Sequence, residues 1–145
     1  MKTLSFNATL VSFYCFTAAA NAGDVSVTVT GAIPNGTRVF VALCAKTLES
    51  SSCHIGESKF AQTPTLKFAF ENVEPARYAI LAFQDLNGTG TLERSKLGIP
   101  LEPFALSNNA GRTGKPTFET AAVSIGPGGG DFQLGLRSIV HRSDQ

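Results

Sequence analysis

The sequence predicts an all-β fold, an antiparallel β-sandwich of about six to seven strands with two long loops at one end. Short runs of alternating apolar and polar residues are separated by turn residues, which is typical of such sandwiches. The composition agrees, with 14 glycines, 7 prolines, one methionine and no tryptophan. No segment after residue 22 has the length and periodicity of an amphipathic helix. A length of 145 residues fits a single domain, which we place at 23–145.

The first 22 residues have the pattern of a secretory signal peptide. Lys2 supplies the positive charge, residues 4–20 are mostly apolar, and Ala20-Asn21-Ala22 is a small-x-small cleavage site. The mature chain is therefore predicted to begin at Gly23, in the periplasm or outside the cell, with no membrane span. A retained membrane anchor is the less favoured alternative, because polar residues interrupt a run that is already short for a span.

The mature chain is expected to carry no net charge, since removal of Lys2 leaves eleven basic and eleven acidic residues. The charges are scattered and form no basic stretch, which argues against nucleic acid as a partner. The remaining partner classes are an envelope protein and a small ligand.

Two cysteines remain in the mature chain, Cys44 and Cys53. An even pair in an exported protein predicts a disulfide bond, and the short loop that it closes predicts a stabilisation of roughly 2–3 kcal/mol. The alternative is a metal site that adds His54 to the two thiols. It is less favoured because structural metal sites usually have four ligands at closer spacing.

The first two strands are predicted on either side of an Asn-Gly turn. Residues 24–31 alternate three valines with serine and threonine, which indicates a half-buried strand. Residues 33–36 form the turn, because Asn-Gly readily takes positive φ. Residues 38–44 are apolar on both faces, so this second strand is predicted to be central.

The middle of the chain predicts one long loop and two more strands. Residues 46–65 show no periodicity and are expected to be a loop with at most a short helical turn. Residues 66–71 alternate and predict the third strand. The turn at 72–76 leads into the fourth strand at 77–84, which is apolar on both faces.

The last third of the chain begins with a second long aperiodic segment, 94–116. Loops beyond about 12–15 residues are uncommon in compact domains and are often functional. A fifth strand is predicted at 117–125 and a last one at 132–136, separated by the glycine-rich turn at 126–130.

Strand direction predicts which segments lie together. If successive strands are antiparallel, strands two and four run the same way. The loops that begin at Lys46 and Asp85 would then leave from one end of the sandwich. The disulfide, the acidic loop at 85–93 and the loop with Asn108 and Asn109 are predicted to share that end.

The segment 85–93 resembles a calcium-binding loop, because oxygen-bearing side chains recur at alternate positions around two glycines. The predicted ligands are Asp85, Asn87, Thr89, Thr91 through its backbone carbonyl, and Glu93. Counted from Asp85, position 12 of the loop is Lys96 instead of the bidentate glutamate of an EF-hand. The predicted calcium affinity is therefore weak, with a Kd on the order of 10⁻⁴–10⁻³ M. The alternative is a plain turn, in which the side chains bond their own backbone and the glycines take positive φ.

Asn108 and Asn109 form a candidate ligand loop, although loop asparagines more often satisfy backbone groups. Catalysis has little support, since the histidines are His54 and His141 alone and no serine-hydrolase, zinc-protease or phosphate-loop motif is present. No catalytic residue is therefore assigned.

Residues 70–80, Phe-Glu-Asn-Val-Glu-Pro-Ala-Arg-Tyr-Ala-Ile, resemble the F-x-x-L-P-P-G-x-Y-A-V signature of transthyretin-like and carboxypeptidase-regulatory-like sandwiches. Further segments are similar to one family of secreted bacterial proteins, the domain of unknown function 2141; they lie at 85–93, 97–100, 104–110 and 114–121. The resemblance implies an exported, immunoglobulin-like or transthyretin-like sandwich with no established activity. The chain departs from the family pattern in its cysteine pair and at Ala76 and Thr89, where glycine and asparagine are usual.

These observations predict an exported, non-enzymatic module that binds a ligand or an envelope partner at its loop-bearing end, with Ca²⁺ as the one cofactor considered. A small periplasmic hydrolase that uses Glu93 or His54 at the same end is the alternative from a different class. A purely structural envelope component is the third.

Overall fold

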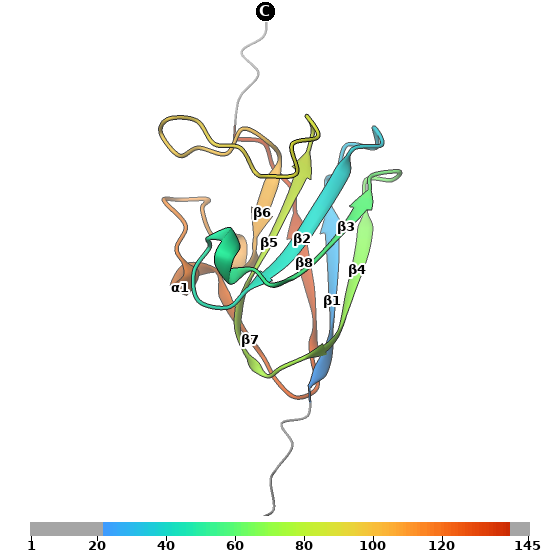
Figure 1. Ribbon diagram of the computed structural model, residues 1–145, viewed down its shortest axis with the longest axis vertical. Helices are drawn as coiled ribbons and strands as arrows, with labels where there is room; N and C mark the ends of the chain where they lie inside the picture. Colours follow the sequence, from blue (N-terminus) through green and yellow to red (C-terminus); the bar gives the residue numbers. More distant parts are fainter. Residues whose placement is uncertain (1–21, 140–145) are drawn as a thin grey trace, which may run out of the picture.

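A computed structural model describes residues 22–139 as a sandwich of two β-sheets (Figure 1). The predicted signal peptide lies outside these residues except for Ala22. The strands are β1 (Gly23–Thr30), β2 (Arg38–Cys44), β3 (Ile55–Phe60), β4 (Leu66–Val73), β5 (Ala76–Asp85), β6 (Phe104–Leu106), β7 (Ala122–Ile125) and β8 (Gly130–Gly135). Sheet A has the order β4-β1-β8, and sheet B has the order β3-β2-β5-β6, with β7 also paired to β5. The predicted all-β sandwich is confirmed.

The core between the sheets is built by the residues that alternate in the sequence. Val27 and Val29 of β1 and Val39 of β2 have no exposed surface, and Phe68 and Ile80 are almost fully buried. Burying one such side chain stabilises the fold by about 1.5–3 kcal/mol. Among the described residues, no helix is long and apolar enough to cross a membrane.

One strand pair departs from the antiparallel pattern. β1 and β8 run parallel, with Val25 opposite Gly130 and Thr30 opposite Gly135. All other named strand pairs are antiparallel. The parallel pair joins the first and last strands of the described chain and completes sheet A.

The segment predicted as a loop at 46–65 contains an additional strand, β3, after the 3₁₀ turn η1 (Ser50–Ser52). β3 pairs antiparallel with β2 at the edge of sheet B, and none of its six residues is buried. An edge strand exposed in this way shows no apolar alternation, so the sequence pattern does not reveal it.

The extra strand reverses the direction of everything that follows, so the prediction that both long loops leave from one end is wrong. β2 and β5 are antiparallel, with Arg38 opposite Asp85 and Cys44 opposite Ala79. The chain therefore leaves Cys44 and Asp85 at opposite ends of sheet B. Asn108 and Asn109 lie in the 3₁₀ turn η2 (Ser107–Asn109), directly after β6, and do not join the Asp85 loop.

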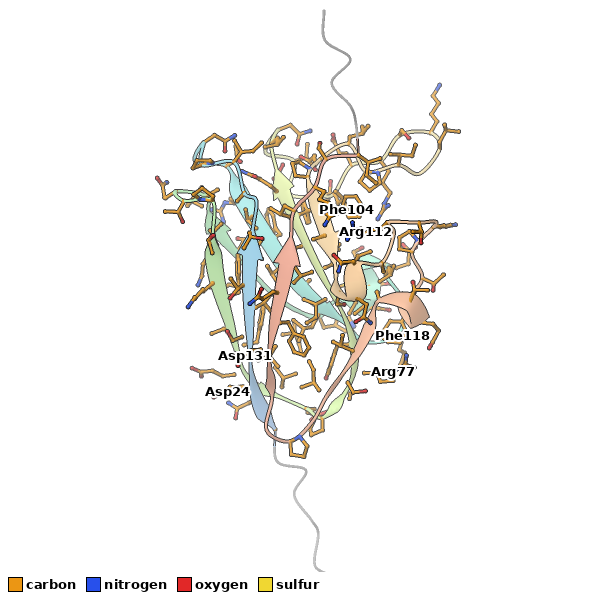
Figure 2. The ribbon with its side chains drawn as sticks, turned by 180° about the vertical axis from the view of Figure 1, so that it is seen from behind. Asp24, Arg77, Phe104, Arg112, Phe118 and Asp131 are labelled. Atoms are coloured by element: carbon orange, nitrogen blue, oxygen red, sulfur yellow. A yellow bond between two sulfur atoms is a disulfide. The ribbon has the colours of Figure 1, made fainter. Side chains whose placement is uncertain are left out.

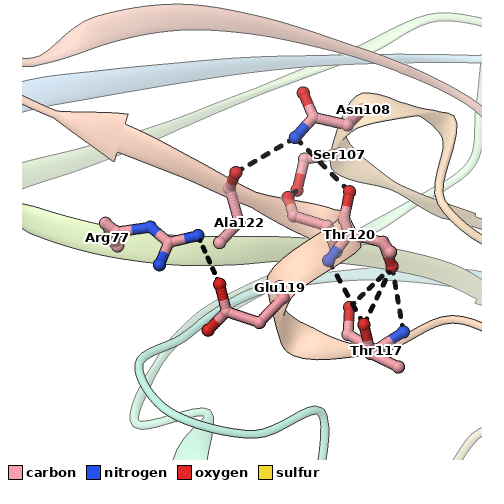
Figure 3. Close-up of polar contacts among 8 residues, drawn as sticks. Arg77, Ser107, Asn108, Thr117, Glu119, Thr120 and Ala122 are labelled. Atoms are coloured by element: carbon pink, nitrogen blue, oxygen red, sulfur yellow. Dashed lines mark hydrogen bonds and ion pairs between the residues drawn. The ribbon is translucent and has the colours of Figure 1, made fainter.

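The predicted fifth strand is shorter than expected, because its first residues form one helical turn, α1 (Phe118–Ala121), before β7 begins. Thr117 caps this turn: its hydroxyl accepts from Thr120 N, and Thr117 N donates to Thr120 Oγ1 at 3.0 Å (Figure 3). This reciprocal pair satisfies backbone donors that a short turn leaves free.

The sandwich has two chemically different ends. We call the end that carries the segments 31–37, 60–65 and 85–103 the loop end, at the top of Figure 1. The opposite end carries the tight turns at 74–75 and 126–129, and we call it the turn end.

Candidate functional site

The predicted calcium loop is closed by one buried carboxylate, that of Asp85, which is 3% exposed. Its Oδ1 accepts from Gly88 N at 2.8 Å and from Thr89 N at 3.1 Å, and its Oδ2 accepts from Gly90 N at 2.8 Å. Gly88 and Gly90 both have positive φ. Three backbone donors converge on one anion, which is the arrangement that the plain-turn interpretation requires.

The other predicted ligands also bond one another. Asn87 Nδ2 donates to Glu93 Oε2 at 2.7 Å, and Asn87 Oδ1 accepts from Thr89 N at 3.3 Å. The Thr89 hydroxyl lies 3.3 Å from the backbone oxygen of Thr91. The structure thus brings all five predicted ligands into one compact loop. Among residues 22–139, no group of three or more His, Cys, Asp or Glu side chains is arranged to hold a metal ion.

A second buried carboxylate, Glu102, supports this loop from the other side. Glu102 is 4% exposed; its Oε1 accepts from Leu86 N at 2.9 Å and its Oε2 from Glu93 N at 3.5 Å. Glu102 therefore accepts hydrogen bonds from residues near both ends of the acidic loop. The sequence pattern did not predict this role; the one available signal is that Glu102 stands between apolar residues in the run Pro100-Leu-Glu-Pro-Phe104.

The predicted disulfide between Cys44 and Cys53 is confirmed, with an S–S distance of 2.02 Å. Cys44 is fully buried, whereas Cys53 is half-buried. The bond fixes the loop 45–52 against the outer face of sheet B, where Leu48 packs on the same apolar cluster as both cysteines. The disulfide bond therefore positions the loop 45–52 as well as stabilising the chain.

Replacing both cysteines with alanine is expected to lower the free energy of unfolding by roughly 2–3 kcal/mol, because the short closed loop constrains the unfolded chain. Urea denaturation of the variant and the parent protein, each with and without reductant, measures the loss. Reductant should destabilise the parent protein and leave the variant unchanged. Equal midpoints for the oxidised parent protein and the variant would contradict this expectation.

Asn108 has a structural role. Its Nδ2 donates to the backbone oxygen of Ala122 at 3.0 Å and lies 3.5 Å from that of Thr120 (Figure 3). Beside it, the buried Ser107 hydroxyl accepts from Ile80 N and donates to Ala121 O. Asn109 has positive φ and lines a surface hollow of about 420 Å³ beside β6. The candidate ligand loop therefore divides into one residue that fixes the backbone and one that is free to face a ligand.

Another hollow lies on the outer face of sheet B, with a cavity volume of about 510 Å³. We call it the sheet B groove. Phe40 and Phe83, on neighbouring strands, form its floor; their rings stack with centroids 5.0 Å apart and planes 9° from parallel. Leu48 of the disulfide loop lines one side, and Leu92, near the end of the acidic loop, lines another.

The rim of the sheet B groove is polar and carries both signs of charge, from Glu49, Glu57 and Arg94. Neither His54 nor Glu93 lines it. The groove has no counterpart in the sequence pattern, because its walls come from two segments that meet only when both fold back over the same sheet. The apolar outward face of β2, visible in the sequence, was the one available signal.

The comparisons with known proteins support one assignment. A family of bacterial proteins, described as "Uncharacterized protein conserved in bacteria (DUF2141)", matches residues 27–132. No curated protein and no solved structure matches the chain. The family match runs from β1 to β8 and includes the acidic loop, both cysteines and the sheet B groove. The chain therefore belongs to the DUF2141 family of uncharacterised bacterial proteins.

Proposed function

We propose that this protein is an exported, non-enzymatic module that binds a small ligand with an aromatic or aliphatic portion in the sheet B groove. The observation that carries the proposal is the stacked pair of Phe40 and Phe83 at the floor of an open hollow of about 510 Å³. Small-ligand sites usually measure about 300–1,000 Å³ and combine an apolar lining with a few polar groups. The disulfide supports export, since such bonds persist in oxidising compartments.

The rim chemistry refines the ligand class. Arg94 offers a guanidinium, and Glu49 and Glu57 offer carboxylates at the same opening. Glu57 is also within 3.5 Å of Lys59. A neutral or zwitterionic ligand with an apolar body satisfies both signs of charge, and this is the class that we propose. An apolar side chain of an envelope protein is the partner that would use the same floor.

Filling the groove is expected to weaken ligand binding by at least about ten-fold. Ala42 points outward from β2 and lines the groove, so Ala42→Leu places new methyl groups on the floor. Ala69 is exposed on β4 of the other sheet, so Ala69→Leu makes the same change away from the groove. A fragment library of aromatic zwitterions is screened by amide chemical-shift perturbation.

Hits should shift the amides of Phe40, Leu48 and Leu92 in the parent protein. They should lose at least about ten-fold in affinity in Ala42→Leu and keep it in Ala69→Leu, since about 1.4 kcal/mol of lost contact corresponds to a factor of ten. Shifts that survive Ala42→Leu, or a library with no hit in the groove, would overturn the proposal.

The positions of the candidate groups support the non-enzymatic proposal. The alternative hydrolase needs Glu93 or His54 beside a substrate pocket. Glu93 instead bonds Asn87 in the acidic loop, and His54 is exposed at the start of β3. Neither lines the sheet B groove, so the binding proposal is better supported than the hydrolytic one.

We also propose weak calcium binding by the acidic loop, which carries the carboxylates of Asp85 and Glu93 and the side-chain amide of Asn87. Calorimetric titration of Ca²⁺ should give a Kd on the order of 10⁻⁴–10⁻³ M for the parent protein. Glu93→Gln keeps the acceptor for Asn87 and removes one charge, so it should weaken binding several-fold; Glu71→Gln, on exposed β4, should not. A flat titration of the parent protein would leave the plain turn as the correct interpretation.

A further inference from the structure

The large apolar side chains left exposed are concentrated at the loop end. Among residues 22–139 there are seven of them: Ile33, Phe60, Leu86, Leu97, Ile99, Leu101 and Ile139. Leu97 is the most exposed, at 86%. The turn end, within the described residues, has none. Scattered exposed apolar residues need no explanation, but a collection of this kind on one end marks an interaction surface.

Charge is divided between the same two ends. The loop end and the loop at 111–116 beside it expose six basic side chains: Arg38, Arg94, Lys96, Arg112, Lys115 and Arg137. The acidic side chains of the described loop end are not fully exposed to solvent. Asp85 and Glu102 are buried, and Glu93 is half-buried and hydrogen-bonded to Asn87.

The turn end has the opposite character. Asp24, Glu71, Glu74 and Asp131 are exposed there, and Figure 2 shows Asp24 and Asp131 in its lower part, with Arg112 and Phe104 above them. Arg77, on the same half of the molecule, is paired with Glu119 at 2.9 Å. The molecule therefore has a basic, apolar end and an acidic, polar end along its long axis.

The most exposed apolar residue is held on an ordered hairpin. Arg94 and Pro100 form an antiparallel bridge, Ser95 N donates to Ile99 O at 2.8 Å, and Gly98 N donates to Ser95 O at 2.8 Å. Lys96 and Leu97 therefore stand at the tip of a closed turn. A cation followed by an aliphatic side chain on such a tip is the chemistry of the boundary between lipid headgroups and acyl chains.

Beside this hairpin is a hollow of about 350 Å³, which we call the hairpin hollow. Its walls are apolar, with Leu97, Ile99, Phe104 and Ile139, and its charged lining residues are Arg94 and Lys115, with no acid among them. Two cations over an apolar lining match an anionic headgroup attached to an acyl chain.

We propose that the loop end docks onto an anionic lipid surface, with Leu97 and Ile99 inserted at the headgroup level and Lys96, Arg94 and Lys115 against the anionic headgroups. The charge asymmetry favours lipid over a protein partner, because a uniformly charged plane attracts the basic end and repels the acidic end, which orients the molecule. Of the residues that this docking uses, Arg94 also lines the sheet B groove, whereas Lys96, Leu97, Ile99 and Lys115 do not.

Vesicle flotation tests the proposal directly. The full chain is expressed with residues 1–22 so that any processing takes place, and is mixed with vesicles of phosphatidylcholine alone or of phosphatidylcholine and phosphatidylglycerol. The partition coefficient should be at least about ten-fold higher on the anionic vesicles, and should fall in high salt as the charges are screened. The double variant Leu97→Ser/Ile99→Ser should lose about ten-fold or more, since it removes the inserted area.

Charge and insertion are separated by matched variants. Lys96→Glu should weaken binding several-fold, whereas Lys46→Glu, exposed just after Cys44 at the other end of sheet B, should not. The chain contains no tryptophan, so Leu97→Trp supplies a single reporter whose emission should shift to the blue on anionic vesicles. Gln133→Trp, exposed on β8, should not shift. Equal partition on both vesicle types, no partition at all, or partition unchanged in Leu97→Ser/Ile99→Ser would overturn the proposal, and the last two would point to a protein partner.

Discussion

Gly129→Ala is expected to destabilise the protein by about 3 kcal/mol or more, although it adds a single methyl group. Gly129 has a φ of 72°, and a Cβ on it would lie 1.8 Å from the backbone oxygen of Asp24. Backbone atoms cannot rotate away as a side chain can. The clash also falls where β1 and β8 begin their parallel pairing, at Val25 and Gly130.

Two other glycines separate the causes of that effect. Gly36 also has positive φ but open space around it, so Gly36→Ala should cost only the conformational strain, about 1–2 kcal/mol. Gly128 has neither restriction, so Gly128→Ala should change the stability by less than about 0.5 kcal/mol. Urea denaturation of the three variants gives the comparison. Equal losses for Gly129→Ala and Gly36→Ala would mean that β8 does not approach β1 as closely as described.

Gln84→Leu is expected to cost about 2–4 kcal/mol, although leucine has a similar volume. Gln84 has no exposed surface. Its Nε2 donates to Ile33 O at 2.7 Å and to Thr37 Oγ1 at 2.9 Å, and its Oε1 accepts from Ile33 N at 2.8 Å. The leucine would leave Ile33 N without its acceptor, would leave Ile33 O with Asn35 N as its donor, and would loosen the turn between β1 and β2.

The matched control is Gln133→Leu, because Gln133 is exposed on β8 and should change the stability by less than about 0.5 kcal/mol. Thermal denaturation measures both variants. Amide hydrogen exchange adds a local readout, in which Ile33 and Thr37 should lose protection in Gln84→Leu while β2 keeps it. Similar stability losses in the two variants would show that the buried amide contributes nothing specific.

The sequence was informative wherever one face of a strand is buried. β1 alternates valine with serine and threonine, and its three valines are in the core. β2 is central in sheet B, as predicted for 38–44, and β5 is apolar on both faces, as predicted for 77–84. The Cys44–Cys53 bond and the family follow from residues close together in the chain, and both are confirmed.

The sequence did not predict the strands whose apolar and polar residues do not alternate with burial. β3 is an edge strand with no buried residue, and β6 has three residues inside a segment of glycines and prolines. Overlooking β3 reversed the predicted direction of β5 and placed the acidic loop at the wrong end. A single undetected strand produces this error because direction alternates with each antiparallel crossing.

The sequence by itself determined the β-sandwich, its buried central strands, the disulfide and the closed acidic loop, since each depends on the local alternation or spacing of side chains. Only the tertiary structure decided which end of the sandwich carries Asp85 and that Glu102 accepts hydrogen bonds from the acidic loop. It also decided that Phe40 and Phe83 form the floor of a groove. It also gathered the exposed aliphatic and basic side chains at one end. These features depend on strand direction and on contacts between segments far apart in the chain, and no local pattern of side chains encodes either.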